Sequence, residues 1–260
     1  KQPDFRLRID FSGGHRRLQS GASAADNRQI PSHFPSQELV FPRFGIKLPL
    51  QYNGYNQYFK TMRQLKFFKD DLMARYGTPL QRIGFDLALG CPNREGGFGA
   101  GCTFCAADGS RARHLTRDLD LAAQARAGID YVRRRYHTEG PYIAYFQSFT
   151  NTNAPVARLR ALYDEALALA DFPVVMISTR PDALPEPVLD WLAELNRERE
   201  VWVELGVQSA HDATLKRIRR GHDWQASAAA IKALDRRGIR VAAHLILGLP
   251  GESPDDWRAT

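Results

Sequence analysis

Three cysteines within fifteen residues are the most chemically suggestive feature of the sequence. In the segment CPNREGGFGAGCTFC, ten residues separate Cys91 from Cys102, and two separate Cys102 from Cys105. Three sulfur ligands in one loop fit an iron–sulfur cluster with one iron left open, a Cys3His zinc site completed by His114 or another histidine, or three thiols without a metal. The position of Cys91 after a strand-like run, and the lack of a second CxxC pair, favour the cluster.

The cysteine count and the composition indicate a reduced, globular protein. Three cysteines cannot all pair in disulfides within one chain, and 260 residues with 43% hydrophobic content can bury a large core. No apolar run approaches twenty residues, and the first residues, KQPDFRLRIDF, lack the apolar core of a signal peptide. We therefore expect a cytoplasmic protein with no membrane partner.

The positive charge of the chain is concentrated near its beginning. Residues 1–60 hold nine Lys or Arg against four Asp or Glu, which gives +5 of the net +7. The same segment is rich in Gly, Ser, Pro and Asn and shows little periodicity, which is typical of loops. We expect residues 1–60 to be a basic, flexible extension and residues 61–260 to form the functional core.

Strand-like and helix-like segments alternate along this core. Short β-branched or aromatic runs predict strands at 82–89, 142–147, 174–179, 201–207 and 240–248. Amphipathic segments predict helices at 62–77, ending at Gly77, at 117–137 with Thr116 as N-cap, and at 155–170, 186–198 and 223–237, the last ending at Gly238. Such alternation predicts an α/β fold with parallel strands. Because five units do not close an eight-stranded barrel, we expect a partial (β/α) barrel, truncated at its C-terminus.

Polar residues follow the predicted strands where each one ends. Cys91 follows the first strand, Gln147 the second, and Thr179 and Arg180 the third. The carboxyl ends of parallel strands meet at one edge, where α/β proteins collect their reactive groups. Glu204 interrupts the apolar fourth strand, and a buried carboxylate needs either a partner or a function.

The sequence resembles a known family in five separate blocks. The cysteine loop is followed in order by AYFQSFTNTNAPV, STRPDALPEPVLDWLAEL, VWVELGVQSAHDATLKRIRRGHD and HLILGLPGE. Together, over about residues 63–257, these blocks resemble the bacterial YhcC/YtqA family of radical S-adenosylmethionine (SAM) proteins, relatives of the Elongator catalytic subunit. The resemblance implies a radical SAM barrel.

The resemblance also implies two cofactors and the residues that hold them. Cys91, Cys102 and Cys105 would bind a [4Fe-4S] cluster whose fourth iron binds SAM. Phe104, inside the CxxC pair, would cover the cluster near the adenine. One electron, from a flavodoxin- or ferredoxin-like donor, would cleave SAM to a 5′-deoxyadenosyl radical that abstracts hydrogen from the substrate.

Further SAM contacts follow from the resemblance at the other strand ends. Gln147 lies where relatives present a glycine- and glutamate-containing motif, and the segment YFQSFTN departs from that pattern. Thr179 and Arg180 would approach SAM, although Arg180 and Asp182 are close enough to pair with each other. The remaining expected contacts come from the last two strands and the loop between them: Glu204, Gln208, Arg220 and His244.

Alternatives remain open for several of these residues. Arg220 would bind the SAM carboxylate with its guanidinium fork, yet it also belongs to the charged run KRIRR, which is typical of a solvated surface. His244 would lie near the SAM ribose, yet a single histidine in an apolar strand is commonly a hydrogen-bonded core residue.

The resemblance implies a substrate as well, namely the side chain of the wobble uridine in tRNA. A net positive charge suits a polyanionic partner. One alternative is a radical SAM enzyme acting on a small metabolite, which would show no salt-dependent affinity for RNA. An alternative of another class is a zinc-stabilised nucleic-acid-binding module without catalysis.

Overall fold

A computed structural model describes residues 37–41, 46–50, 67–94, 101–112, 115 and 119–260. The chain divides into two compact units, residues 12–79 in one and residues 1–11 with 80–260 in the other. The expected division between a basic extension, 1–60, and a functional core, 61–260, stays a prediction.

The smaller unit contains a β-hairpin and a helix. Strands β1 (Gln37–Phe41) and β2 (Ile46–Leu50) pair antiparallel, so this part of the expected loop is ordered as a hairpin. Helix α2 (Phe68–Tyr76) ends at Gly77, whose φ of 70° lies in the left-handed region that a glycine enters without strain. The predicted stop of this helix is therefore confirmed, and residues 62–66 lie outside the described residues.

The larger unit is built on a parallel sheet of five strands, which confirms the α/β prediction. The strands are β3 (Gln81–Phe85), β4 (Tyr142–Phe146), β5 (Val174–Thr179), β6 (Glu200–Gln208) and β7 (Arg240–Leu245). They lie side by side in the order of the sequence, and each pairs in parallel with the next. The sheet does not close on itself, as expected of a partial barrel.

Strand β3 ends earlier than the sequence predicted, at Phe85 rather than at residue 89. From Asp86 onward the backbone leaves the sheet, because the Asp86 N–H donates to Oε1 of Gln124 at 2.7 Å. The N–H of Ala88 then turns back to Oδ1 of Asp86 at 2.9 Å. This turn starts the loop that carries the cysteines. Strand β7 also ends early, at Leu245 rather than at residue 248, after which the Ile246 N–H donates to the carbonyl of Gln208.

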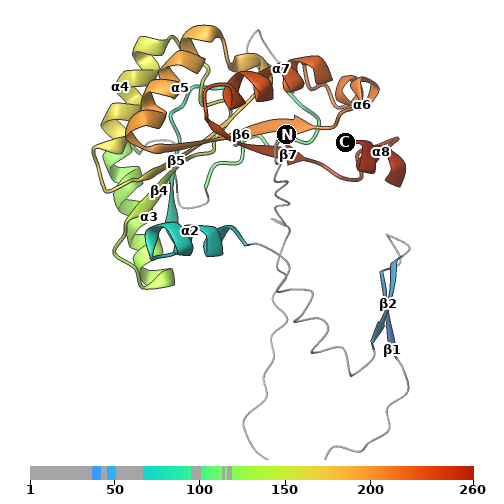
Figure 1. The fold of residues 1–260 in the computed structure, drawn as a ribbon, viewed down its shortest axis with the longest axis horizontal. Helices are drawn as coiled ribbons and strands as arrows, with labels where there is room; N and C mark the ends of the chain where they lie inside the picture. The colour runs from blue at the N-terminus through green and yellow to red at the C-terminus, as the bar shows by residue number, and fades with distance from the viewer. Residues whose placement is uncertain (1–36, 42–45, 51–66, 95–100, 113–114, 116–118) are drawn as a thin grey trace, which may run out of the picture. The chain divides into compact units, whose positions relative to one another are not determined.

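Four helices of the larger unit follow the outer side of the sheet (Figure 1): α3 (Leu121–Tyr136), α4 (Val156–Leu167), α5 (Glu186–Glu198) and α7 (Trp224–Asp235). The unit also contains the short helices α6 (Asp212–Arg217) and α8 (Pro254–Ala259) and a 3-10 turn at Pro181–Ala183. The prediction for α5 is confirmed at both ends, whereas α4 ends at Leu167 rather than at residue 170. Within the described residues, no helix combines the length and the apolar character that crossing a membrane requires.

Helix α3 begins later than expected, and its N-cap is a different residue. The oxygen of Asp120 accepts from the N–H of Ala123 at 2.6 Å, which satisfies a backbone donor that the first turn leaves open. Thr116, the predicted N-cap, lies outside the described residues. The six-residue helix α6 was not predicted, because so short a segment carries too few turns to show a period.

The side chains on the two faces of the sheet lie in different environments. Phe146, Ile177 and Val203 belong to the apolar core shared with the helices, together with other buried residues such as Tyr163 and Trp191. Their neighbours Tyr145, Ser178 and Glu204 point to the opposite face, because side chains alternate along a strand. The sheet therefore presents an apolar face to the helices and a partly polar face on its inner side.

Candidate metal centre

The three cysteines lie in the loop that follows β3. Cys102 is buried, with 5% of its surface exposed, whereas Cys91 and Cys105 are half-buried, and all three are free of disulfides. Two backbone turns shape the loop: the Arg94 N–H donates to the carbonyl of Cys91 at 2.8 Å, and the Cys105 N–H to that of Cys102 at 3.0 Å. Residues 95–100, between these turns, lie outside the described residues.

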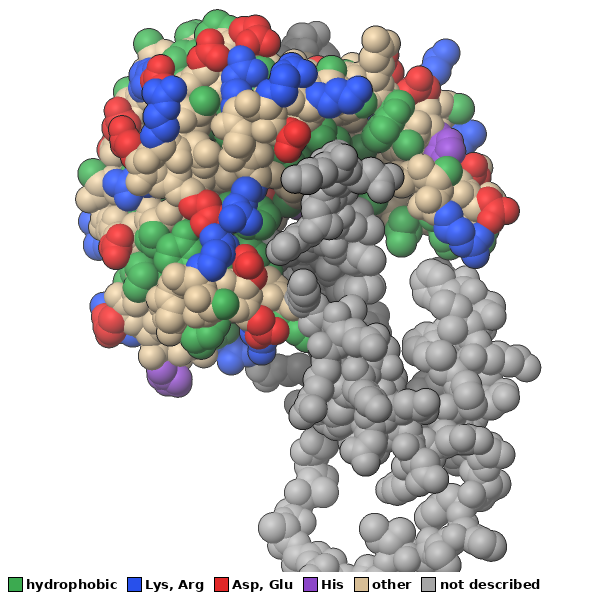
Figure 2. Space-filling model, in the orientation of Figure 1, with side chains coloured by type: hydrophobic (Ala, Val, Ile, Leu, Met, Phe, Trp, Pro, Cys, Tyr) green, Lys and Arg blue, Asp and Glu red, His purple; other side chains and the backbone are tan. Residues whose placement is uncertain are grey.

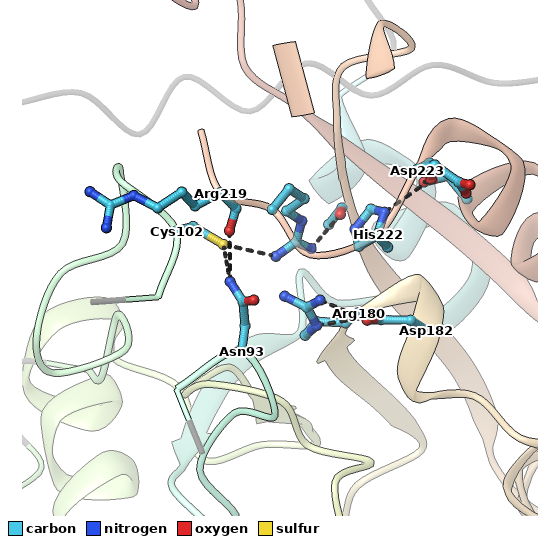
Figure 3. A network of polar contacts seen from close by, with 10 residues as sticks. Asn93, Cys102, Arg180, Asp182, Arg219, His222 and Asp223 are labelled. Atoms are coloured by element: carbon cyan, nitrogen blue, oxygen red, sulfur yellow. Dashed lines mark hydrogen bonds and ion pairs between the residues drawn. The ribbon is translucent and has the colours of Figure 1, made fainter. Parts of the chain in front are cut away.

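The sulfur of Cys102 is held by two nitrogen donors from distant parts of the loop and the chain. Nδ2 of Asn93 lies 3.3 Å from Sγ, and Nη1 of Arg220 lies 3.5 Å from it (Figure 3). N–H donors of this kind stabilise the thiolate form, which is the form that ligates iron in iron–sulfur clusters. The donor set of this loop therefore fits a cluster.

A compact site for one metal ion is not formed in the described part of the chain. No group of three His, Cys, Asp or Glu side chains among the described residues is close enough to hold a single ion. In a cubane cluster each cysteine binds its own iron, so the three sulfurs need not meet at one point. His114, named as the possible fourth zinc ligand, lies outside the described residues.

Arg94 ties the CxxC pair to the start of the loop. Its guanidinium donates to the carbonyls of Cys105 at 3.1 Å, Ala106 at 2.7 Å and Ala107 at 3.3 Å. The same group lies 5.6 Å from the ring centre of Phe149, in the segment after β4. One arginine therefore fixes the peptide groups around Cys105.

The segment after β4 lies against both flanks of the cysteine loop. The Thr150 N–H donates to the carbonyl of Gly90, and the Phe149 N–H to that of Gly109, both at 3.0 Å. The side-chain oxygens of Ser148 and Thr150 are buried, and neither has a hydrogen-bond partner among the described residues. Gln147 is half-buried at the start of this segment. Two acceptors without partners therefore stand where the family motif was expected.

Thr179 and Arg180 end β5 in different environments. Thr179 is buried, and its hydroxyl lies 2.5 Å from that of Thr152. Arg180 is buried as well and bonds Asp182 through two parallel contacts of 2.8 and 2.7 Å, the pairing that the sequence left open. Burial acts against the charge of Arg180, but the bonds to Asp182 raise its pKa. Its Nη1 has no partner among the described residues.

Polar side chains from three other strands surround the carboxylate of Glu204 on β6. Its Oε2 accepts from the hydroxyls of Tyr145 on β4 and Ser178 on β5, both at 2.8 Å, and lies 3.6 Å from Nε2 of His244 on β7. Burial alone would raise the pKa of Glu204, but the contacts with His244 and Tyr145 outweigh it and lower the pKa to about 2. Burial of Tyr145 and the charge of Glu204 raise the pKa of that phenol. The buried carboxylate is therefore partnered and ionised.

Gln208 and Arg220 meet at an irregularity near the end of β6. The register of β6 against β7 shifts between Gly206 and Gln208, and Gln208 adopts a φ of 73°. Nη2 of Arg220 donates to the carbonyl of Gly206. A Cβ at Gly206 would lie 2.5 Å from that nitrogen and 2.8 Å from Nε2 of Gln208. Only glycine leaves room for the guanidinium to lie along the strand.

Arg220 is buried rather than solvated, with 6% of its surface exposed. Burial lowers the pKa of its guanidinium, and the contact with Cys102 acts in the opposite direction. A solvated arginine in the run KRIRR was one of the two interpretations of this residue. The structure contradicts that interpretation, because the turn after α6 directs the side chain inward.

The structure gathers some of the expected site residues and separates others. Cys102 and Arg220 lie together, and Arg180 is close by, since a Cβ at Gly221 would lie 3.1 Å from its Nη2. Glu204 and His244 form a second polar group on the inner face. Phe104 is 42% exposed beside the cysteines. Their contacts with SAM stay predictions.

Sequence reasoning missed two residues that complete these groups. Asn93 was read only as part of the loop, although an amide two residues after a ligand cysteine is well placed to donate to sulfur. Tyr145 was read only as strand. Strand alternation places Tyr145 on one of the two faces of the sheet. Only the register of β4 against β5 shows that this is the face of Ser178 and Glu204.

Comparison with known proteins identifies relatives of the whole core. The chain is 41% identical over 202 residues to the uncharacterized protein YtqA of Bacillus subtilis, covering 76% of this chain and 62% of YtqA. It is 40% identical over 190 residues to protein YhcC of Escherichia coli, covering 72% of this chain and 60% of YhcC. The chain therefore spans about 60% of the length of these curated relatives.

Two further matches connect the chain with archaeal proteins. Over 77 residues, 30% of this chain and 14% of the relative, it is 39% identical to a tRNA uridine(34) acetyltransferase of Methanocaldococcus infernus. The solved structure of Elp3 from the same organism matches with a TM-score of 0.50 and 21% identity, covering 68% of this chain and 40% of that one. At this level of identity, the match shows a shared fold.

A family profile covers most of the larger unit. The Radical SAM superfamily matches residues 87–260, which include all three cysteines, strands β4 to β7 and the inner polar face. The chain therefore belongs to the Radical SAM superfamily.

Proposed function

We propose that the protein is a radical SAM enzyme that holds a [4Fe-4S] cluster through Cys91, Cys102 and Cys105. The observation that carries the proposal is the sulfur of Cys102, which is buried and accepts from both Asn93 and Arg220. When bound there, the cluster would supply the electron for the reductive cleavage of SAM, and with it the radical chemistry that removes hydrogen from the substrate. A flavodoxin- or ferredoxin-like protein is the proposed electron donor.

The residues around the cysteines would orient SAM and exclude water. The hydroxyls of Ser148 and Thr150 are buried acceptors without partners in the described part of the chain and suit the SAM amino group. Nη1 of Arg180 is a buried donor that likewise lacks a partner among the described residues, and it suits the SAM carboxylate. Phe104 is the exposed aromatic that would cover the cluster, and His244, held by Glu204, would face the ribose.

We assign tRNA as the substrate, with the wobble uridine as the modified position. The partial similarity to a tRNA uridine(34) acetyltransferase supports this assignment. The net positive charge of the chain suits a polyanionic partner. On the face that Figure 2 shows, Lys and Arg are interspersed with Asp and Glu, so this face adds little to the assignment.

The cluster is tested by anaerobic purification of the full-length protein, with iron and sulfide analysis and an EPR spectrum of the reduced protein. We expect a cluster signal that changes when SAM is added and that C102A abolishes. The variant S110A, at an exposed position after the CxxC pair, is the control and should keep the signal. Stoichiometric zinc without iron after anaerobic reconstitution would instead support the zinc-stabilised module.

The substrate is tested with tRNA from a strain that lacks the gene. After incubation with reductant and SAM, nucleoside mass spectrometry should reveal a new mass at the wobble uridine together with 5′-deoxyadenosine. An active enzyme that cleaves SAM but neither binds nor modifies tRNA at any salt concentration would point to a small metabolite.

A further inference from the structure

The turn formed by residues 218–221, between α6 and α7, is fastened to the cysteine loop. The Thr103 N–H donates to the carbonyl of Ile218 at 3.0 Å, and Nδ2 of Asn93 donates to that of Arg219 at 2.8 Å. Arg219 and Gly221 have φ values of 53° and 82°, so the backbone on both sides of Arg220 is in the left-handed region. These contacts fix the direction in which the Arg220 side chain leaves the turn.

The buried guanidinium of Arg220 has no carboxylate partner among the described residues. Within the described residues it forms no ion pair with Asp or Glu, whereas its neighbour Arg180 is bound to Asp182. A guanidinium remains protonated in proteins, and an isolated charge that is this buried is costly. Among the groups that it contacts in the described part of the chain, only the sulfur of Cys102 can carry a negative charge.

The contacts of Arg220 hold its guanidinium against the sulfur. Nη1 donates to Cys102 and Nη2 to Gly206, and each of these nitrogens keeps a second N–H. Nε is buried without a partner among the described residues. The contact with Cys102 therefore does not depend on SAM, and the remaining N–H groups leave a contact with SAM open.

We propose that Arg220 raises the reduction potential of the cluster by holding a permanent positive charge and an N–H donor against the sulfur of Cys102. This inference rests on the proposed function, because it requires a cluster at the three cysteines. Reduction adds one negative charge to the cluster and its thiolates. A fixed positive charge in a buried site stabilises the reduced form more than the oxidised form, which makes the cluster easier for a biological donor to reduce.

The experiment is a redox titration of the full-length protein without SAM, followed by EPR, with wild type compared to R220Q and R219Q. Both variants remove one positive charge, but the Arg219 side chain is exposed and takes no part in the sulfur contact. We expect the reduction equilibrium constant of R220Q to fall about tenfold, which is about 59 mV for one electron. R219Q should keep the wild-type potential.

Two outcomes separate this inference from its alternatives. If R220Q binds full iron and keeps the wild-type potential but loses the EPR change that SAM causes, Arg220 serves SAM alone and the inference is wrong. If R220Q does not retain iron, R220K is titrated instead. The lysine side chain is shorter and holds its charge farther from the sulfur, so the potential of R220K should lie below that of wild type. A potential equal to or above the wild-type value would contradict the inference.

A third outcome concerns the proposed function. If the wild-type protein assembles no cluster after anaerobic reconstitution, the proposed function fails, and the inference fails with it. If wild type forms the cluster while the potentials of the Arg220 variants do not move, only the inference fails. Iron content and circular dichroism, measured before each titration, distinguish the two cases.

Discussion

Oε2 of Glu204 on β6 faces Nε2 of His244 on β7 across a distance of 3.6 Å. The carboxylate also accepts from Tyr145 and Ser178, and its pKa is lowered from 4.5 to about 2. Because the folded pKa lies below the unfolded one, the ionised carboxylate stabilises the fold at neutral pH. That contribution is present above about pH 4.5 and is lost as pH falls toward about 2.

The first prediction concerns E204Q. The pKa difference corresponds to about 3 kcal/mol of unfolding free energy. Urea unfolding at about pH 6 should give E204Q a lower free energy of unfolding than wild type. The difference in free energy should be smaller at about pH 3, because wild type has by then lost part of this contribution. E198Q, at an exposed position on α5, should stay close to wild type at both values. A gap between E204Q and wild type that does not change with pH would contradict the prediction.

The second prediction concerns G206A. The added methyl group would lie 2.5 Å from Nη2 of Arg220, so the guanidinium must leave its present position, in which it contacts both Gly206 and Cys102. We expect a loss of about 1–3 kcal/mol in unfolding free energy and a reduced iron content after reconstitution. G238A is the control, because its glycine has a φ of 67° and no atom lies within 4 Å of the added methyl group. It should lose about 1 kcal/mol and keep its iron.

The third prediction concerns R94A. Without Arg94, three carbonyls around Cys105 lose their donor, so the loop should release iron several-fold faster in the presence of a chelator. R94K should rescue the variant only in part, because an ammonium on a flexible stem cannot match the planar guanidinium at three carbonyls. Equal release rates for R94A and the exposed-site control R126A would show that the contacts do not hold the loop.

The fourth prediction concerns Q124A. The Gln124 amide accepts from the backbone of Asp86 and donates to the carbonyls of Asp86 and Leu119, all within 3.1 Å. Removing it leaves buried backbone groups without partners, so the free energy of unfolding should fall by about 2–3 kcal/mol. R126A, on the exposed face of the same helix, should change it by less than about 0.5 kcal/mol. Thermal or urea unfolding of the two variants provides the measurement.

Much of the sheet was predictable because its signal is local. The five strands are short apolar runs with buried neighbours, and the runs at 142–147 and 174–179 lie within one residue of β4 and β5. The end of β3 was not predictable in this way. It depends on Gln124, which is distant in sequence and reaches the Asp86 backbone only after α3 has packed on the sheet.

In the candidate site, too, features with a local sequence signal were predictable, and features that depend on distant residues were not. The three cysteines were recognisable from their spacing, and their loop lies where the sequence placed it. The inward direction of Arg220 was hidden, because four of the five residues in the run KRIRR are basic and only one of those four is buried. That choice depends on the left-handed backbone at Arg219 and on the space left by Gly206, and neither follows from residue type alone.

The contact between Cys102 and Arg220 joins residues 118 positions apart, and that between Asn93 and Arg219 spans 126. During synthesis, the cysteine loop therefore leaves the ribosome long before the turn that supplies its donors. Closing so long a stretch of chain is entropically costly, and the contact cannot form until the turn at 218–221 has been synthesised. Iron supplied to the nascent chain would meet unprotected thiols, whereas iron supplied to the finished fold meets a sulfur that already has its donors.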